Sequence, residues 1–232
     1  MVSDSLRLTP AQPAVKSASR KLLLWEIGCI FWVAFAGSLL HFAFELTDYW
    51  RPIALFAAVN ESAWEHTKMY FWPGLAWALA QYTYTRHLAQ NYWLGKLSAL
   101  VLTPLAIFTS YFSYMGLVTA IGARPSLPIM LGIMFLGIAI GQLTSWRILS
   151  AAPLGESQRK IAVGYAAILV AFGSFTYFPP RVFPFENFYC YRYTGEFGIL
   201  SDYGPYRVFY RGERPGGGVN YCATPAQRAT GG

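Results

Sequence analysis

Five long apolar blocks, each nearly free of charge, constrain this chain more than any other feature. They cover about residues 22–42, 62–85, 97–121, 127–147 and 160–178. A helix of about 20 apolar residues crosses the hydrocarbon core of a bilayer. Only 12% of the 232 residues are charged, whereas about a quarter is usual in soluble domains. The sequence therefore predicts an all-α integral membrane protein with five transmembrane helices, in which residues 22–178 form the membrane domain.

The first block superficially resembles a secretory signal peptide. It is longer than the apolar core of such a peptide and contains Glu26, so we expect an uncleaved spanning helix. Residues 1–21 are polar and form a short lead on the cytoplasmic side.

Lysine and arginine in the short connecting segments predict the orientation, because cytoplasmic loops carry the excess of these residues. One side holds Arg7, Lys16, Arg20, Lys21, Arg86, Lys96, Arg147, Arg159 and Lys160. The other holds Arg51, Lys68 and Arg124. The first side has nine basic residues and the second has three, so the amino terminus is expected in the cytoplasm and the carboxyl-terminal tail outside. The basic residues are spread over loops and tails and form no groove for phosphates, which excludes a nucleic-acid partner.

The segments outside the five blocks carry further predictions. Residues 52–59 are too few to span, so a short interfacial or re-entrant helix is expected, with Pro52 in its first turn. In the tail, 179–232, period-two alternation over 189–193 and 206–210 predicts a small β-hairpin with "TGEFG" and "SDYGP" as turns. From about residue 212 the Gly- and Pro-rich end is expected to be disordered unless a partner holds it.

Cys190 and Cys222 both fall in the outward tail, where a disulfide survives. A bridge between them and two free thiols are both open, because pairing cannot be deduced from sequence.

Polar chemistry is concentrated just before and inside the start of the second block, in "NESAWEHTK". The polar members are Asn60, Glu61, Ser62, Glu65, His66 and Lys68. One interpretation is structural: Ser62 and Glu65 match the Ser-x-x-Glu capping box of a helix start. Trp64 would then anchor the interface, and Lys68 would pair with Glu65 at i,i+3.

A second interpretation is a binding site. His41 and Glu45 end the first block on the same outward side, and ionisable groups at membrane depth usually mark functional sites. The set His41, Glu45, Glu61 and His66 suits a divalent metal such as zinc or manganese. The same groups are also suited to relaying protons, or to forming a hydrogen-bond network without a ligand.

Three functions therefore stay open. The first is binding or transport of a cation or proton, and the second is a metal-dependent membrane enzyme in which Glu65 acts as the base. The third is an accessory subunit of a larger membrane complex, joined through the tail or through the Gly137-x-x-x-Gly141 face of the fourth block. That glycine pair also suits packing within the chain. Whether the protein is an enzyme stays undecided, because the sequence contains no recognisable nucleophile or zinc-protease motif.

Four remaining polar groups are expected at the cytoplasmic ends of helices. Glu26 and Gln142 are expected to extend toward the interface. Arg86 and the neighbouring His87 lie in a turn where we expect contact with solvent and lipid head groups.

Three motifs together resemble a known family. "HFAFE", "LFAAVNESAWEHTK" and "TGEFGI" are similar to segments of an uncharacterised bacterial family of small polytopic membrane proteins, a domain of unknown function. The matching positions are His41, Glu45, Asn60, Glu61, Ser62, Trp64, Glu65, His66, Lys68, Thr194, Gly195 and Gly198. Phe197 stands where that family tends to have tyrosine, and the family's Asp-Pro before Thr-Gly is absent. The resemblance implies the membrane fold, a location in the cytoplasmic membrane of a bacterium and the place of the polar site. It supplies no activity.

Overall fold

The computed structural model describes residues 12–189 and 192–209. Cys190 and Cys222 lie outside the described residues, as does the segment from residue 212 onward. The disulfide and the disorder of the carboxyl terminus therefore remain predictions.

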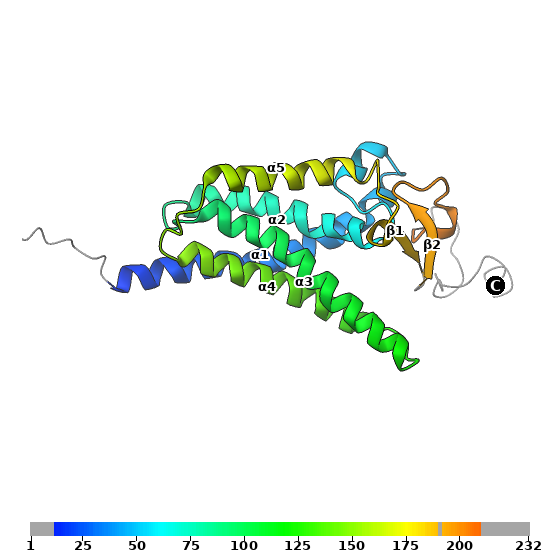
Figure 1. Ribbon diagram of the computed structural model, residues 1–232, viewed down its shortest axis with the longest axis horizontal. Coiled ribbons are helices and arrows are strands. Elements are labelled where there is room, and N and C mark those ends of the chain that lie inside the picture. The colour runs from blue at the N-terminus through cyan, green and yellow to red at the C-terminus, as the bar shows by residue number, and fades with distance from the viewer. Residues whose placement is uncertain (1–11, 190–191, 210–232) are drawn as a thin grey trace, which may run out of the picture. The chain divides into compact units, whose positions relative to one another are not determined.

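Helices dominate the described part of the chain (Figure 1). They are α1 (Gln12–Leu46), α2 (Ala63–Thr85), α3 (Tyr92–Ala120), α4 (Leu127–Ser150) and α5 (Gln158–Ser174). Each overlaps one of the five apolar blocks. The prediction of a mainly helical protein is confirmed.

Three of these helices are long and apolar enough to cross a membrane among the residues described: α1 from Val15, α3 and α4. The predicted number of five spans is not supported. Helix α5 has 17 residues, which is the lower end of the about 17–25 residues that span the hydrocarbon core. Helix α2 is 23 residues long, but charged side chains in its first two turns and many tryptophan, tyrosine and threonine residues reduce its hydropathy.

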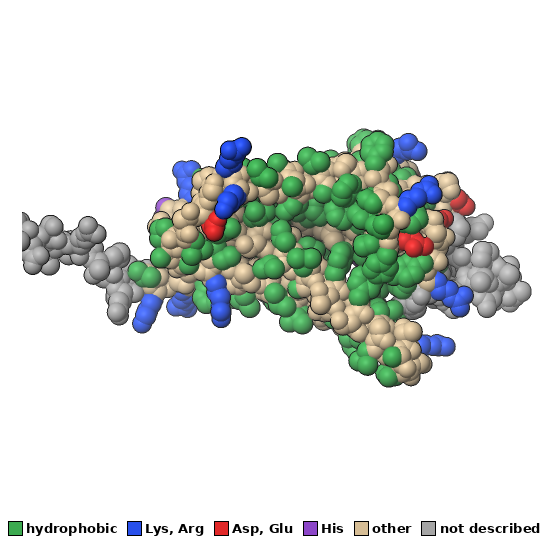
Figure 2. Space-filling view, viewed as in Figure 1, with side chains coloured by type: hydrophobic (Ala, Val, Ile, Leu, Met, Phe, Trp, Pro, Cys, Tyr) green, Lys and Arg blue, Asp and Glu red, His purple; other side chains and the backbone are tan. Residues whose placement is uncertain are grey.

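Hydrophobic side chains cover the flanks of the helices visible in Figure 2, whereas the visible lysine and arginine side chains lie near helix ends. Exposed examples on the three apolar helices are Phe31, Phe35, Leu105, Leu117 and Leu131. Large exposed apolar surfaces are rare in soluble monomers. This distribution therefore fits helices that are surrounded by lipid, as the class of protein requires.

The chain divides into two compact units. Among the described residues, the first unit comprises 12–32 and 74–162, and the second comprises 33–73, 163–189 and 192–209. Helices α1, α2 and α5 contribute residues to both units.

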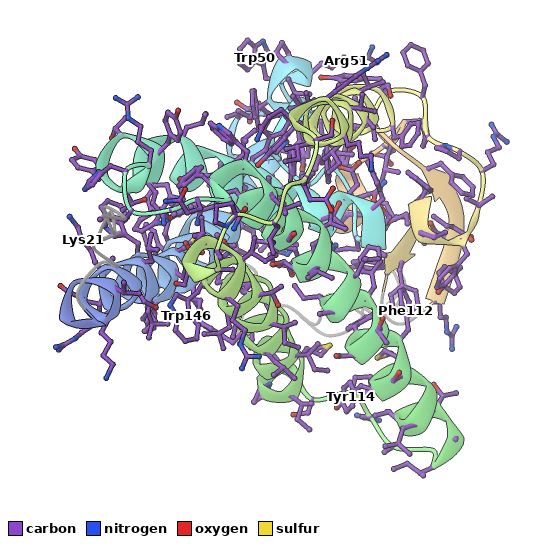
Figure 3. All side chains as sticks on the ribbon, turned by 60° about the vertical axis from the view of Figure 1, so that its left-hand side comes forward. Lys21, Trp50, Arg51, Phe112, Tyr114 and Trp146 are labelled. Atoms are coloured by element: carbon purple, nitrogen blue, oxygen red, sulfur yellow. The ribbon has the colours of Figure 1, made fainter. Side chains whose placement is uncertain are left out.

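In the first unit, α3 and α4 lie side by side through a close approach at two glycines (Figure 1). A Cβ atom added at Gly137 would lie 2.3 Å from Cγ1 of Ile107, and one added at Gly141 would lie 2.1 Å from Oγ1 of Thr103. At the far end of α3, the Tyr114 hydroxyl accepts a hydrogen bond from the backbone N–H of Ser126, just before α4 (Figure 3). The Gly-x-x-x-Gly face is thus occupied by a helix of the same chain.

The first unit also buries a charged pair. Glu26 of α1 pairs with Lys96 of α3 and accepts a hydrogen bond of 2.9 Å from the amide of Gln81 in α2. Glu26 and Gln142 were expected to reach the interface, but both are buried. The expectation is wrong for Glu26 because Lys96, which is 70 positions away in the sequence, supplies a counter-charge inside the unit.

The second unit contains the short elements. A 3₁₀ helix, η1 (Arg51–Leu55), has Pro52 in its first turn, as expected for the segment between the first two blocks. Strands β1 (Glu186–Tyr189) and β2 (Arg192–Phe197) form an antiparallel pair. Two more 3₁₀ helices, η2 (Phe183–Phe185) and η3 (Gly204–Tyr206), flank this hairpin in the sequence.

The hairpin is present, but its strands differ from the predicted ones. Residues 194–197, which were expected to form a turn, belong to β2, and Tyr206 ends a 3₁₀ helix instead of beginning a strand. Gly198 explains where β2 ends, because its φ of +63° turns the chain and a Cβ there would lie 2.8 Å from the Thr176 carbonyl oxygen. Alternating side chains did not reveal this turn.

The close approach of α3 and α4 yields the first testable prediction. Replacing Gly141 with alanine forces a methyl group onto Thr103, so the free energy of unfolding should fall by about 1–3 kcal/mol. The control is Gly132→Ala on the same helix, where nothing lies within 4 Å of the added Cβ and stability should hold or rise slightly. Denaturant unfolding in detergent micelles measures both, and equal stabilities would contradict the packing described.

Candidate metal centre

Three ligand-type side chains converge in the second unit: His41 near the end of α1, Glu61 just before α2, and His66 in its first turn. Nε2 of His41 lies 3.8 Å from Oε1 of Glu61, and Nε2 of His66 lies 3.4 Å from Oε2 of the same carboxylate. One ligand atom from each residue lies within 4.8 Å of the other two. These three residues are called the His–Glu–His cluster below.

A backbone contact fixes the protonation of one imidazole. Nδ1 of His66 lies 2.8 Å from the carbonyl oxygen of Ser62. A carbonyl oxygen only accepts hydrogen bonds, so Nδ1 carries the hydrogen. Nε2 faces the Glu61 carboxylate. If Nε2 carried neither a proton nor a metal ion, its lone pair and the carboxylate oxygen would repel each other. The arrangement therefore favours a proton or a metal ion at Nε2.

The carboxylate of Glu61 is held in its charged form. Burial alone would raise its pKa, but the hydrogen bond and charge of His66, together with the charge of His41, lower the pKa to about 2. The side chain still keeps 45% of its surface exposed. The cluster thus offers an anionic ligand that solvent can reach.

Hydrogen bonds to the backbone place Glu61 before the helix begins. The Asn60 side chain accepts from the Ser62 N–H at 2.8 Å and donates to the carbonyl oxygen of Gly198. The side chain of Asn187, which is buried, accepts from the N–H of Glu61 at 3.0 Å and donates to the Glu196 carboxylate. The loop before α2 is therefore tied to the β-hairpin and to the turn that follows it.

The start of α2 contains one half of a capping box. Oγ of Ser62 accepts the Glu65 N–H at 3.2 Å, as expected of an N-cap serine. The Glu65 carboxylate does not return to the Ser62 N–H, which Asn60 already satisfies. It accepts instead from the N–H of Val59 at 3.0 Å and from the Thr176 hydroxyl at 2.9 Å.

Glu65 and Lys68 form a buried ion pair, with 2% and 0% of their side-chain surfaces exposed. The Lys68 ammonium also donates to the carbonyl oxygen of Ala54 at 2.7 Å and to the hydroxyl of Thr176 at 2.9 Å. All three ammonium donors are used. Glu61 and Glu65 therefore have different partners, since Glu61 faces the two imidazoles and Glu65 pairs with Lys68.

Glu45 lies apart from the His–Glu–His cluster. Its carboxylate accepts hydrogen bonds from the backbone N–H groups of Val208 and Phe209. The structure thus brings together three of the four residues that sequence spacing grouped as metal ligands. The fourth holds the segment after η3 in place.

Trp64, the expected interface anchor, packs inside the second unit. Its ring stacks on Phe172 and Phe185 with centroids 4.8 and 5.0 Å away. Thr176 and Asn187, which hold Glu65 and Glu61, were not singled out from sequence. The available signal was that each is a small polar residue that sits among apolar and aromatic neighbours.

The fold and the cluster define a class: a helical membrane protein in which two imidazoles and a carboxylate meet near helix ends. Residues 14–199 match a protein family described as a family of unknown function (DUF6512). The match covers more than half of the chain, so the chain belongs to this family. The resemblance to an uncharacterised family is thereby confirmed. Neither the curated proteins nor the solved structures include a match.

The buried ion pair yields a second prediction. Replacing Lys68 with alanine leaves Glu65 charged and without its counter-ion, which should lower the free energy of unfolding by about 3–5 kcal/mol. Lys160→Ala, at an exposed position of α5, is the control and should change stability little. Denaturant titrations in detergent compare the variants.

A double variant separates charge from packing. Glu65→Gln combined with Lys68→Met removes both charges and should be less destabilised than Lys68→Ala. A double variant as unstable as the sum of its single changes would show that the pair is not the source of the effect.

Proposed function

We propose that this protein is a polytopic protein of the bacterial cytoplasmic membrane that binds one divalent transition-metal ion at His41, Glu61 and His66. One observation carries the proposal: two imidazole Nε2 atoms face one carboxylate, while Nδ1 of His66 donates to the Ser62 carbonyl. Histidine ligands of metals commonly donate their second N–H to a backbone carbonyl in this way.

The spacing of the cluster supports zinc first and manganese second. Ligands at about 2.0–2.1 Å from a tetrahedral zinc ion stand roughly 3.3 Å apart. The two N···O separations of 3.4 and 3.8 Å are near this value. A set of two imidazoles and one carboxylate suits zinc, and oxygen ligation also suits manganese.

Three protein ligands leave a further coordination position for water or a bound substrate. The exposure of Glu61 makes this position reachable from outside the protein. Glu65 is not included as a catalytic base, because its carboxylate is taken by Val59, Thr176 and Lys68. The proposal is therefore that the cluster binds a metal ion, and it assigns no catalytic base outside the cluster.

A proton is the second candidate ligand. Protonation of Nε2 in His66 would give an ion pair with Glu61 at the observed 3.4 Å and would need no metal. Binding of a proton and binding of a metal exclude each other at this nitrogen, so one experiment separates them.

We also propose that all five helices cross the membrane with the amino terminus in the cytoplasm. Lys68 and Lys96 are buried in ion pairs and do not face head groups. Without them the count of basic residues is eight against two, so the bias survives. Val163, Leu169 and Val170 give α5 an exposed apolar face, as a lipid-facing helix needs.

The metal proposal predicts about one equivalent of zinc or manganese in gently solubilised protein. His66→Ala and Glu61→Gln should each reduce the bound metal at least tenfold, since each removes one of three ligands. Glu45→Gln is the matched control, because Glu45 is a carboxylate near His41 that lies outside the cluster. Elemental analysis after reconstitution with each metal gives the answer.

Three results would revise the ligand set. Loss of metal in Glu45→Gln would add Glu45 to it, and retention in Glu61→Gln would remove Glu61. If the wild type bound no metal after reconstitution, the proposal of a metal site would be overturned. The second candidate, a proton on Nε2 of His66, would then stand.

The orientation proposal predicts a pattern of cysteine labelling. In a chain without its native cysteines, Ala123→Cys and Arg181→Cys should react with a membrane-impermeant maleimide added to whole cells or spheroplasts. His87→Cys and Ala152→Cys should react only after the membrane is opened. All four positions are exposed. Labelling of His87→Cys from outside would show that α2 does not cross, and protection of Arg181→Cys would show the same for α5.

A further inference from the structure

A cavity of about 440 Å³ lies in the first unit, among the end of α2, the start of α3 and the connection from α4 to α5. Its lining includes Tyr82, Arg86, Gln90, Trp93, Glu156 and Gln158. It is called the Arg86 pocket below. Its volume falls in the range of small-molecule sites, about 300–1,000 Å³. None of its lining residues belongs to the His–Glu–His cluster.

The side chain of Asn91 holds one wall of the pocket in place through hydrogen bonds. The Asn91 amide donates to the carbonyl oxygens of Ile148 and Ala152 at 3.1 and 3.0 Å, and its oxygen accepts the Leu154 N–H at 3.0 Å. Although Asn91 precedes α3, its side chain makes no capping bond to that helix. It joins the end of α4 and the connection after it to the start of α3, so hydrogen bonds within the chain hold two sides of the cavity together.

The pocket is lined by two side chains of opposite charge, Arg86 and Glu156, that form no ion pair with each other among the described residues. The Arg86 guanidinium lies over the ring of Tyr82, 5.5 Å from its centre. Side-chain amides of Gln90 and Gln158 add donors and acceptors. A ligand that fits this set has an anionic group and a cationic group on one short scaffold.

The place of the pocket indicates where such a ligand comes from. It is built at the ends of α3 and α4, which are long and apolar enough to cross a membrane. Ends of spanning helices lie at the level of lipid head groups, where tyrosine and tryptophan rings are enriched. Tyr82 and Trp93 stack with centroids 4.9 Å apart in the lining.

We propose that the Arg86 pocket binds the zwitterionic head group of an aminophospholipid. Arg86 holds the phosphate diester, and Glu156 accepts hydrogen bonds from the primary ammonium group, with the two glutamine amides beside them. A quaternary ammonium has no N–H to donate, and a glycerol head group has no cation. The pocket therefore selects phosphatidylethanolamine over phosphatidylcholine and phosphatidylglycerol.

Native mass spectrometry of the full chain in detergent tests this selectivity, with the three lipids titrated separately. The wild type should bind phosphatidylethanolamine at least tenfold more tightly than either of the others. Arg86→Gln should weaken binding of phosphatidylethanolamine at least tenfold. Glu156→Gln should abolish the preference over phosphatidylglycerol without weakening phosphatidylglycerol itself. Arg147→Gln, which removes an exposed cation of α4 outside the lining, is the control and should behave as the wild type.

Folding of each variant is checked by its denaturant midpoint, which should equal that of the wild type. Equal binding of the three lipids by the wild type would overturn the proposal, as would unchanged binding in both variants.

Glycerophosphoethanolamine, the same head group without acyl chains, distinguishes a lipid ligand from a soluble phosphodiester. Displacement of the lipid by this soluble ester at equal concentration would overturn a lipid ligand and assign the pocket to a soluble phosphodiester. Its failure to compete supports the lipid.

Discussion

The second unit depends on the ion pair between Glu65 and Lys68. Moving two charges out of water costs several kcal/mol for each ion, and only close contact with further hydrogen bonds offsets that cost. Both conditions are met here, because Val59, Ala54 and Thr176 complete the bonding of the pair. The network joins η1 and the segment after it to the first turns of α2 and to the residues after α5. Because these segments are bonded to one another, they fix the position of the loop that contains Glu61.

The same pair decides which glutamate is available to a ligand. Glu65 is almost fully buried and has its bonding partners within the chain, whereas Glu61 is nearly half exposed and faces two imidazoles. The first unit repeats the buried arrangement, since Glu26 is enclosed with Lys96 and Gln81. In both units a fully buried carboxylate serves the packing of helices. The half-exposed carboxylate is the one suited to binding.

Sequence reasoning predicted what depends on local pattern and missed what depends on distant partners. The lengths of the apolar blocks predicted the helices. The expectation that two helix ends lie on the same side of the membrane grouped His41 with Glu61 and His66, which the structure brings together. Glu45 was misplaced within that group because its partners are backbone amides at positions 208 and 209, which no side-chain spacing reveals. Lys96 was counted as a loop charge because Glu26 is 70 positions away. The hairpin was expected, but the turn at Gly198 set its strands.

The hydrogen bond from the Glu61 N–H to Asn187 has a consequence for the order of assembly. All three residues of the His–Glu–His cluster lie in the first 66 positions, so they leave the ribosome well before Asn187 does. Domains generally fold as units, amino-terminal parts first, during synthesis. The His–Glu–His cluster, however, gains the hydrogen bond to Asn187 only when the strand containing residue 187 has emerged. An early chain therefore contains His41, Glu61 and His66 without the hydrogen bond that Asn187 accepts from the Glu61 N–H. The geometry of the His–Glu–His cluster is therefore completed late in translation, after all five helices have been synthesised.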